Sequence, residues 1–566
     1  MSARMKVRLS PTDQARIDEL IARARDERWA ERMFDHDTSL WTDDPDVGTT
    51  IADRLGWLES PAHFALQVPA LEAFGDGVME AGFDTAVIMG MGGSSLAPDV
   101  LHRTFGTTEG YLGLRILDST DPAAVGAVMD ELDPLETLWI VASKSGTTTE
   151  PLAFMAEAWS RVEAELEARG SRQKPGEFFA VITDPGKSVE AIPNHDDIRE
   201  QFLNPPDIGG RYAALTYVGL VPASLIGIDI DALLAAGLAM LDACREPEPR
   251  ANPGLQLGLV MGGLAQAGRD KLTFIADEAI ASFGAWAEQL IAESTGKHGG
   301  GIVPVDLEPP RAADAYGPDR AFVHLSLAGS SAGGAAQRQL VADLEQAGHP
   351  VIEIEIDDPI DLAGEMVRWE VATAFAGAVL GIDPFDQPDV EDAKERTRKV
   401  LADARDADLT TIADDALLVR ERGVEDLAQA LRPSLRLLEP PNYVAIQAFI
   451  APGAAQDAGI AGLRVALEAT GCATTAGYGP RFLHSTGQLH KGGPSTGVFL
   501  QLTSDHPDDR PIPGWPYTFG RLIDAQARGD REALRAHDRP VVHLHLGEDL
   551  EGDLAILERA IASALA

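Results

Sequence analysis

Short apolar runs that alternate with longer amphipathic stretches are the feature that most constrains the fold of this chain. The runs that begin at Thr85, Gly113, Thr137 and Phe178 are each bounded by turn residues and separated by helix-like segments. Such alternation predicts βαβ units and a parallel sheet, because parallel strands need crossover connections. In this architecture ligands bind beyond the carboxyl ends of the strands.

A second region of the same kind begins near residue 230, and a third follows the double proline at Pro440 and Pro441. Apolar runs that start at residues 272, 302, 321 and 351, and then at 443, 497 and 540, predict further strands. We expect an α/β protein with a helical segment at 1–60, α/β domains at 61–230 and 231–435, and a C-terminal α/β portion at 436–566.

The charge balance excludes several classes of partner. Among 566 residues, 89 Asp and Glu outnumber 47 Lys and Arg, and the formal net charge is −42. Nucleic acids and anionic membranes are bound through cationic surfaces, so we expect neither as a partner. The sequence has no apolar run of membrane-spanning length and no signal peptide, so we expect a cytoplasmic protein. Cys244 and Cys472 have no metal-ligand spacing and are expected to be buried packing residues.

A glycine-rich turn, Gly90 to Ser95, follows the first expected strand and starts a helix. Its glycines allow a close approach of the backbone to a ligand, and the free N–H groups of the helix start suit an anion. Two alternatives stay open. One is a nicotinamide dinucleotide site with Asp118 near the ribose, although a dinucleotide fingerprint has glycine in place of Ser95. The other is a turn that binds no ligand.

A cluster of hydroxyl side chains follows the third expected strand, directly before a helix. Hydroxyls and backbone N–H groups that converge at a helix N-terminus are typical of a phosphate site. The alternative is a helix cap without a ligand. The segment, which lacks the Walker pattern, contains Ser143, Lys144, Ser145, Thr147 and Thr148.

Three charged residues lie in segments where a catalytic residue can be expected. Arg211 follows two glycines, which allow its guanidinium to enter a pocket. Glu293 ends an apolar helix before a glycine-rich loop, where burial and neighbouring cations can tune a carboxylate as a base. Lys394 lies on a polar helix. The alternatives are a surface arginine, a carboxylate at a helix end and an exposed helical lysine.

The tail contributes candidate histidines. His484 and His490, with Lys491, lie in one polar, glycine-rich stretch. Histidine is the usual proton carrier near neutral pH, so either imidazole is a candidate for acid/base chemistry. His543 and His545 share a strand face, a spacing found in metal sites, but no third ligand is evident and packing is favoured.

In combination, these motifs resemble those of glucose-6-phosphate isomerases, also called phosphoglucose isomerases. GMGGSS, SKSGTTTEP, DIGGRY, ESTGK and FDQPDVEDAK occur in the family's order over about residues 85–400. Ala213 stands where serine is usual and Asp389 where glycine is usual, and both departures are mild. The stretch at 38–59 and the tail look most like the isomerase half of bacterial transaldolase/phosphoglucose isomerase fusions, and a transaldolase activity is not expected.

The resemblance implies reversible conversion of D-glucose 6-phosphate to D-fructose 6-phosphate through a cis-enediol, in glycolysis and gluconeogenesis. It also implies two sugar-isomerase (SIS) domains with flavodoxin-like parallel sheets, usually in a homodimer and without a metal or organic cofactor. By the same resemblance, Glu293 is the base, Arg211 stabilises the negative charge of the intermediate and Lys394 assists ring opening. The family's phosphate-binding positions correspond to Ser94, Ser143, Lys144, Ser145, Thr147 and Thr148.

The ring-opening histidine departs from the family's order. In the family it lies between the base and the lysine, and here that segment has no histidine in a matching context. The LHSTGQ stretch around His484 resembles the family's histidine segment but follows Lys394, so we assign the role to His484, with His490 as the second candidate. A dual phosphoglucose/phosphomannose isomerase and a non-catalytic SIS-domain regulator that binds sugar phosphates remain as alternatives.

Overall fold

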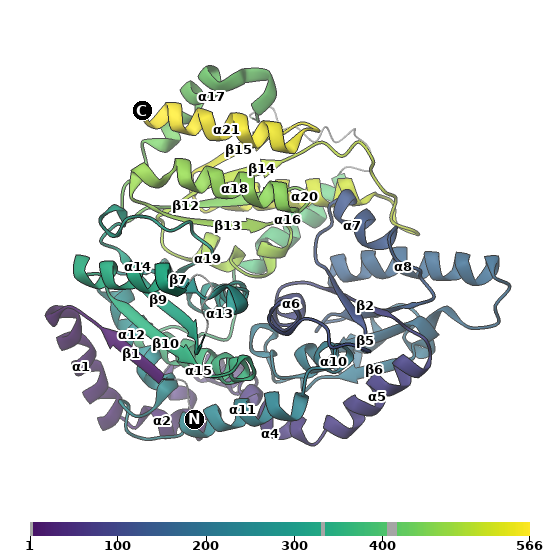
Figure 1. Cartoon of the computed structure of the whole chain (residues 1–566), viewed down its shortest axis with the longest axis horizontal. Coiled ribbons are helices and arrows are strands. Elements are labelled where there is room, and N and C mark those ends of the chain that lie inside the picture. The colour runs from purple at the N-terminus through teal and green to yellow at the C-terminus, as the bar shows by residue number, and fades with distance from the viewer. Residues whose placement is uncertain (1–3, 330–333, 404–415) are drawn as a thin grey trace.

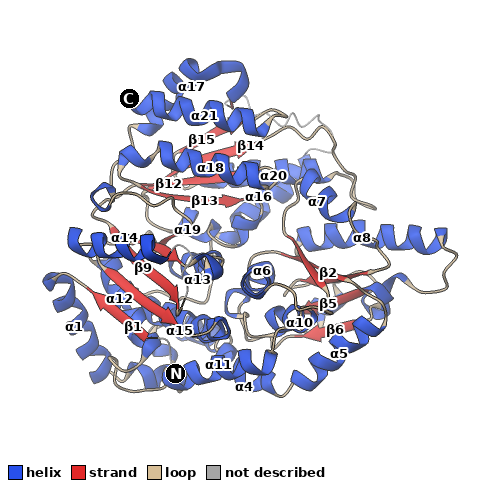
Figure 2. Ribbon diagram, viewed as in Figure 1, coloured by secondary structure: helices blue, strands red, loops and turns tan. Residues whose placement is uncertain are grey.

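The computed structural model describes residues 4–329, 334–403 and 416–566. These residues form three five-stranded sheets flanked by helices (Figure 1, Figure 2). We call the three sheets, with their helices, the first, second and third units, in the order in which the chain completes them. The architecture confirms the expected α/β class.

The strands of the first unit are β2 (Thr85–Gly90), β3 (Gly113–Leu117), β4 (Thr137–Ala142), β5 (Phe179–Thr183) and β6 (Glu200–Leu203). Their spatial order is β3-β2-β4-β5-β6, and all neighbours are parallel. This is the flavodoxin-like order, in which the direction of winding reverses between the first and the third strand. In open α/β sheets such a reversal marks the crevice where ligands bind, which here is expected at the carboxyl ends of β2 and β4.

The strands of the second unit are β7 (Lys271–Ala276), β8 (Val303–Val305), β9 (Arg320–Leu327), β10 (Val351–Ile356) and the N-terminal β1 (Arg4–Arg8). The order β8-β7-β9-β10 repeats that of the first unit, and β1 adds to β10 in the antiparallel direction. The sequence pattern predicts helix for 1–60 and misses β1, because RMKVR is an alternating polar strand without an apolar run.

The strands of the third unit are β11 (Leu417–Leu418), β12 (Tyr443–Phe449), β13 (Ala473–Tyr478), β14 (Gly497–Thr503) and β15 (Val541–His545). The order β13-β12-β14-β15-β11 is parallel throughout and again flavodoxin-like. β11 and the helix α17 (Val419–Leu435) lie before the predicted limit at residue 436, yet they pack with this unit, where α17 covers α21 (Leu550–Leu565).

Helices connect and cover the three sheets. Before the first sheet lie α1 (Pro11–Asp26), α2 (Trp29–Phe34), α3 (Pro45–Ala52), α4 (Ser60–Ala65) and α5 (Val68–Glu80). Around it lie α6 (Gly93–Phe105), α7 (Pro122–Met129), α8 (Thr149–Ala168), α9 (Lys187–Glu190) and α10 (Tyr217–Leu225). The second unit has α11 (Ile230–Ala243), α12 (Pro253–Gln266), α13 (Phe283–Thr295), α14 (Gly334–Ala347) and α15 (Leu362–Leu380). There follow α16 (Val390–Asp403), α18 (Ala454–Ala466), α19 (Gly487–Gly492) and α20 (Phe519–Ala536).

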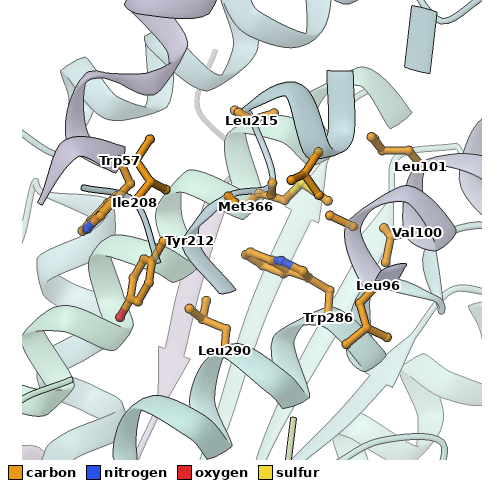
Figure 3. Close-up of a cluster of buried hydrophobic side chains, with 14 of the residues drawn as sticks. Trp57, Leu96, Val100, Leu101, Ile208, Tyr212, Leu215, Trp286, Leu290 and Met366 are labelled. Carbon is orange, nitrogen blue, oxygen red and sulfur yellow. The ribbon is translucent and has the colours of Figure 1, made fainter. Parts of the chain in front are cut away.

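One hydrophobic cluster runs through the first and second units, and α13 lies at their contact. Figure 3 shows Trp286 and Leu290 of α13 among apolar side chains that include Leu96 of α6. The third unit has a core of its own, but Phe519 and Leu522 at the start of α20 belong to the shared cluster. The third unit is therefore fixed to the other two through α20.

No helix in the described part of the chain is both long and apolar enough to cross a lipid bilayer. The thiols of Cys244 and Cys472 are buried and unpaired, and burial raises the pKa of both. They are packing residues, as predicted.

Candidate active site

Two helix N-termini meet at the crevice of the first sheet. β2 pairs with β4 so that Gly90 lies opposite Ala142 at their carboxyl ends, and α6 and α8 begin directly beyond these ends. The free N–H groups and the positive dipole ends of two adjacent helices attract a phosphate dianion. The predicted phosphate ligands lie at these two starts, Ser94 on α6 and Ser143, Ser145, Thr147 and Thr148 directly before α8.

The hydroxyls before α8 form a compact turn. Ser143 Oγ lies 2.9 Å from Thr148 Oγ1, and Ser145 Oγ lies 2.9 Å from Thr147 Oγ1. Gly146 in this turn has a φ of 66°, a conformation that favours glycine. The turn therefore gathers hydroxyl groups at the N-terminus of α8, where an anion is favoured.

Lys144 belongs to the same turn, but its ammonium contacts the end of the neighbouring strand. Nζ donates to Asp184 Oδ2 at 2.5 Å and to the carbonyl of Pro206 at 2.9 Å. The side chain of Lys144 therefore holds the turn in place.

Arg211 is buried, and all three of its guanidinium nitrogens have partners. Nε donates to Ser294 Oγ at 2.8 Å, and Nη1 donates to Gln387 Oε1 at 2.9 Å. Nη2 donates to two backbone carbonyls in the turn at 384–386, at 2.8 and 2.9 Å. Nη1 also lies 3.2 Å from a carboxylate oxygen of Glu293. The charge of Arg211 is therefore fixed beside Glu293.

Glu293 lies on the last turn of α13 with its side chain 12% exposed. One of its oxygens faces Arg211, and the other accepts a hydrogen bond from Gln289 Nε2 at 3.0 Å. Gln289 also donates to the backbone carbonyl of His484 at 2.9 Å. A carboxylate that is oriented at both oxygens and open on one side suits a general base.

Two glycines at the start of α6 allow three segments to meet. A Cβ added at Gly92 would lie 2.4 Å from the carbonyl oxygen of His484, and one added at Gly93 would lie 2.1 Å from the carbonyl oxygen of Gly210. Any side chain here would displace the segments that contain Arg211 and His484. The close approach brings both segments to the start of α6, one of the two predicted phosphate-binding turns.

His484 ends the short helix η10 (Arg481–His484) and contacts the first unit. Its Nε2 lies 3.0 Å from Oε1 of Glu150, a buried carboxylate in the first turn of α8. Burial raises the pKa of Glu150, but the charge and hydrogen bond of His484 outweigh it, and the pKa lies below its ordinary value. A carboxylate that orients an imidazole leaves the other ring nitrogen for proton exchange.

His490 lies instead inside the third unit. Its Nδ1 accepts a hydrogen bond from Gln447 Nε2 at 3.2 Å, and its ring packs between aromatic side chains. Burial, with the nearby charge of Lys491, holds the pKa of His490 well below the ordinary value. Lys491 itself pairs with Asp530 at 2.5 Å in the same interior.

Lys394 lies on the exposed face of α16, and its charge lowers the pKa of Glu150. α16 is joined to the tail through Asp389, whose carboxylate accepts from Gln488 Nε2 at 2.6 Å and whose backbone N–H donates to Gln488 Oε1 at 2.8 Å. Asp389 is one of the two departures from the family's motifs. It connects the lysine helix to the segment that contains His484.

Lys297 adds a second buried cation beside Arg211. Its Nζ donates to Asp386 Oδ1 and to the carbonyl of Asp383, both at 2.5 Å. Burial and the charge of Arg211 lower the pKa of Lys297 to about 8. Positive charge is therefore concentrated next to Glu293 although the chain as a whole is strongly acidic.

Three polar residues of this site were not predicted. Glu150 ends the hydroxyl motif, where the sequence pattern indicates only a helix start. Gln289 precedes Glu293 by one helical turn, and this spacing was the available signal because residues four apart share a helix face. Gln387 follows the turn that binds Arg211, and only the folded chain brings the two together.

The residues considered as ligands of a dinucleotide or a metal ion contact other side chains of the protein. Asp118, the candidate ribose ligand, pairs with Arg481 of the third unit at 3.3 Å. His543 and His545 contact the hydroxyl of Thr503 at 2.8 and 3.0 Å, which agrees with packing roles. Over residues 4–329, 334–403 and 416–566, no group of three or more His, Cys, Asp or Glu is placed to hold a metal ion.

Comparison with known proteins gives one family. A family model described as phosphoglucose isomerase matches residues 68–302. A probable glucose-6-phosphate isomerase of Haloarcula marismortui is 30% identical over 377 residues, which are 61% of this chain and 84% of that protein. A glucose-6-phosphate isomerase of Rubrobacter xylanophilus is 28% identical over 397 residues, 62% of this chain and 90% of that one.

A solved structure shares the fold. A hypothetical protein of Thermus thermophilus matches with a TM-score of 0.59 at 23% identity, over 70% of this chain and all of that one. The sequence relatives extend the likeness from fold to family. With its motifs assembled at one crevice, and with these relatives matched over most of their length, the chain belongs to the glucose-6-phosphate isomerase family.

Proposed function

We propose that this protein interconverts D-glucose 6-phosphate and D-fructose 6-phosphate, a step of glycolysis and gluconeogenesis, in the cytoplasm. The observation that supports the proposal most is the presence of two charged pairs beside the predicted phosphate site, Glu293 with Arg211 and His484 with Glu150. Isomerisation of a cyclic aldose needs one set of groups to open the ring and another to move a proton between two carbons. The crevice offers both.

In this proposal the substrate phosphate binds at the starts of α6 and α8. Their N–H groups and the hydroxyls of the two turns surround the anion, and helix dipoles add to the attraction. Because the Lys144 ammonium is engaged with Asp184, Lys144 contributes through its position in the turn.

His484 opens the sugar ring. Opening breaks the bond between C1 and O5, so O5 gains a proton while the hydroxyl at C1 gives its proton to a solvent water molecule and becomes a carbonyl. The imidazole, oriented by Glu150, donates to O5, and Lys394 on the same side of the crevice assists. His490 does not suit this role, because its buried ring is held neutral within the third unit.

Glu293 then moves the proton between the carbons. Its carboxylate removes the C2 proton to form a cis-enediol and returns a proton to C1, while the hydroxyl proton at O2 passes to O1. Arg211 lies 3.2 Å from the base, so its delocalised charge stabilises the negative charge that develops on the two oxygens.

A coupled assay on the purified protein, without added metal, tests the proposal. We expect fructose 6-phosphate to form from glucose 6-phosphate at a kcat on the order of 10 s⁻¹ or more. Binding of glucose 6-phosphate without turnover would favour the non-catalytic regulator instead. Mannose 6-phosphate in the same assay tests the dual isomerase, since phosphate and enediol groups alone do not select the configuration at C2.

We also propose the finer points of the resemblance. The domain division at 61–230 and 231–435 into two SIS-type domains fits the first and second sheets, and the tail together with 38–59 supports kinship with the isomerase half of transaldolase/phosphoglucose isomerase fusions. A homodimer is proposed from the family, and sedimentation analysis tests it.

A further inference from the structure

We propose that Gln526, on helix α20 of the third unit, is a positioning residue for the ring-opening pair. The inference rests on the proposed function, because it assigns a role within the same site. Gln526 is 3% exposed, and its Nε2 donates to Glu150 Oε1 at 2.6 Å. The same oxygen lies 3.0 Å from His484 Nε2. Gln526 therefore contacts the one carboxylate oxygen that orients the imidazole.

Thr120, which follows β3 in the first unit, fixes the orientation of the Gln526 amide. Its hydroxyl donates to Gln526 Oε1 at 2.7 Å, and Thr120 is fully buried. Because the Glu150 carboxylate can only accept, the NH2 end of the amide faces Glu150, and the Thr120 hydroxyl holds the carbonyl end. Hydrogen bonds thus connect Thr120 to Gln526, Gln526 to Glu150, and Glu150 to His484. Thr120 and Glu150 belong to the first unit, and Gln526 and His484 belong to the third, so each contact in this chain joins the two units.

An amide suits this position for electrostatic reasons. Glu150 is 4% exposed, and a buried carboxylate is costly unless its oxygens accept hydrogen bonds. A cation at position 526 would compete with His484 for the charge of Glu150, and an apolar side chain would remove one of the two hydrogen bonds to Glu150 Oε1. Gln526 supplies a neutral donor, so Glu150 keeps its charge available for the contact with His484.

The same face of α20 also sets the position of the lysine helix. Gly529 lies one turn after Gln526, and a Cβ at Gly529 would lie 2.6 Å from Thr397 Oγ1 and 2.9 Å from the Thr397 backbone nitrogen. Thr397 lies one turn after Lys394 on α16. Because the backbones of α20 and α16 touch here, α20 determines how far Lys394 lies from Glu150.

The start of α20 is anchored on the helix that contains Glu150. Phe519 stacks on Phe154 of α8, with ring centroids 6.1 Å apart and an interplanar angle of 15°. Phe519 precedes Gln526 by seven residues, so both lie on the same helix face. One face of α20 thus contacts α8 and, one turn further on, α16, and it aligns the groups on these two helices.

Ring opening can be measured separately from isomerisation. An enzyme that opens and recloses the ring exchanges the α and β anomers of glucose 6-phosphate, and this exchange needs no proton transfer at C2. In a Glu293→Gln background, exchange NMR of the anomers therefore reports on the ring-opening groups alone. In proteins that keep Glu293, the rate of conversion of glucose 6-phosphate to fructose 6-phosphate reports on ring opening and proton transfer together.

The test compares Gln526→Met, which keeps the length of the side chain and removes its hydrogen bonds, with Gln266→Met. Gln266 is a glutamine of α12 that donates to Val379 O in the second unit, remote from the site, so it is the matched control. We expect Gln526→Met to lower anomer exchange and kcat by about 10-fold or more, with KM changed less than about 2-fold. We also expect the acid limb of kcat/KM to move to higher pH, because loss of a hydrogen bond to the charged carboxylate raises its pKa.

Anomer exchange and an acid limb that match those of Gln266→Met would overturn the inference. If Gln526→Met does not fold, Thr120→Val replaces it, since this near-isosteric change frees the Gln526 amide to rotate. For Thr120→Val we expect the acid limb of kcat/KM to move in the same direction by a smaller amount. An acid limb that does not move would contradict the positioning role of Gln526.

A readout without substrate separates this inference from the proposed function. The hydrogen-bonded Nε2 proton of His484 gives a downfield signal in proton NMR, which we expect to be retained in Gln266→Met and lost or broadened in Gln526→Met. An inactive wild-type protein with this pattern would refute the proposed function and leave the positioning of His484 by Gln526 standing. An active wild-type protein whose signal is unchanged in Gln526→Met would refute the positioning alone.

Discussion

Arg211 donates to Ser294, to Gln387 and to two carbonyls of the turn at 384–386, in addition to its contact with Glu293. A guanidinium with so many fixed donors keeps its charge at one point, where it stabilises a developing negative charge without reorganisation. Lysine has a single charge centre and cannot reproduce the planar set of donors. The identity of this one side chain is therefore decisive for the proposed chemistry.

Replacement of Arg211 by lysine is expected to lower kcat by about 100-fold, because one stabilising donor to the oxyanion is lost. KM is expected to change by less than about 5-fold, because the proposed phosphate site lies at the starts of α6 and α8 and does not include Arg211. Steady-state kinetics in the coupled assay measures both. A KM effect that exceeds the kcat effect would contradict the assignment and indicate a role for Arg211 in phosphate binding.

Gly93 lies so close to a neighbouring segment that it leaves no room for a side chain. A Cβ there would lie 2.1 Å from Gly210 O, so Gly93→Ala must displace the segment that contains Arg211. We expect kcat to fall by about 100-fold, as for a misplaced catalytic group, together with a lower unfolding temperature. Gly77→Ala is the matched control, because no atom lies within 4 Å of its added Cβ, and we expect it to be neutral or slightly stabilising. Equal kinetics for the two variants would show that the loops do not need this contact.

Among the elements, the segment after β14 connects the first and third units through a histidine. His506 Nδ1 lies 3.6 Å from Asp121 Oδ2 at the start of α7, and Nε2 lies 3.5 Å from Asp524 Oδ1 on α20. Burial lowers the pKa of His506, but Asp524 and Asp121 outweigh it and raise the pKa above the ordinary 6.5. A protonated imidazole between two carboxylates holds the units together.

The contacts of His506 with Asp121 and Asp524 predict that the free energy of unfolding depends on pH. A histidine with a raised pKa contributes its full stabilisation below the unfolded value of about 6.5 and loses it as the pH rises through the folded pKa. The unfolding free energy of the wild type relative to His506→Gln is therefore expected to be larger at pH 6 than at pH 9. Urea unfolding of both proteins at the two pH values measures the difference, and a difference that does not change with pH would exclude the charged bridge.

The sequence predicts the elements whose apolar runs are continuous, and these include the inner strands β2, β4, β7, β9, β12 and β14. β13, with the sequence ATTAGY, lacks such a run because small and hydroxyl-bearing residues fill it. β11 has two residues, and its pairing with β15 depends on the folded third unit. The sequence thus predicts the inner strands and also the edge strands β3 and β8, whereas the edge strands β11 and β13 depend on tertiary contacts.

For the whole molecule, the site lies where all three units meet, as Figure 1 shows around α6, α13 and α19. The first unit supplies the turns proposed to bind phosphate, the second supplies Glu293, and the third supplies His484. The sequence motifs predict which residues belong to the site, but the pairing of His484 with Glu150, and of Glu150 with Gln526, joins segments more than 300 residues apart. No local pattern encodes such contacts.

Because the groups of this site come from one chain, activity should not require a partner subunit. We expect the specific activity of a proposed dimer to stay constant, within about 2-fold, on dilution through its dissociation range, since oligomers dissociate by mass action. Activity measured against protein concentration, beside sedimentation at the same concentrations, tests this. A loss of specific activity that follows dissociation would show that a second chain completes the site.

Glu293 is proposed to move a proton between C2 and C1 of a hexose 6-phosphate, and the whole function depends on this transfer. The most direct measurement is proton NMR of glucose 6-phosphate in D2O with the wild-type protein and with Glu293→Gln. We predict that the wild type forms fructose 6-phosphate and incorporates solvent deuterium, and that Glu293→Gln loses both by about 1000-fold or more while anomer exchange persists. Isomerisation by Glu293→Gln at a rate near that of the wild type would contradict the account.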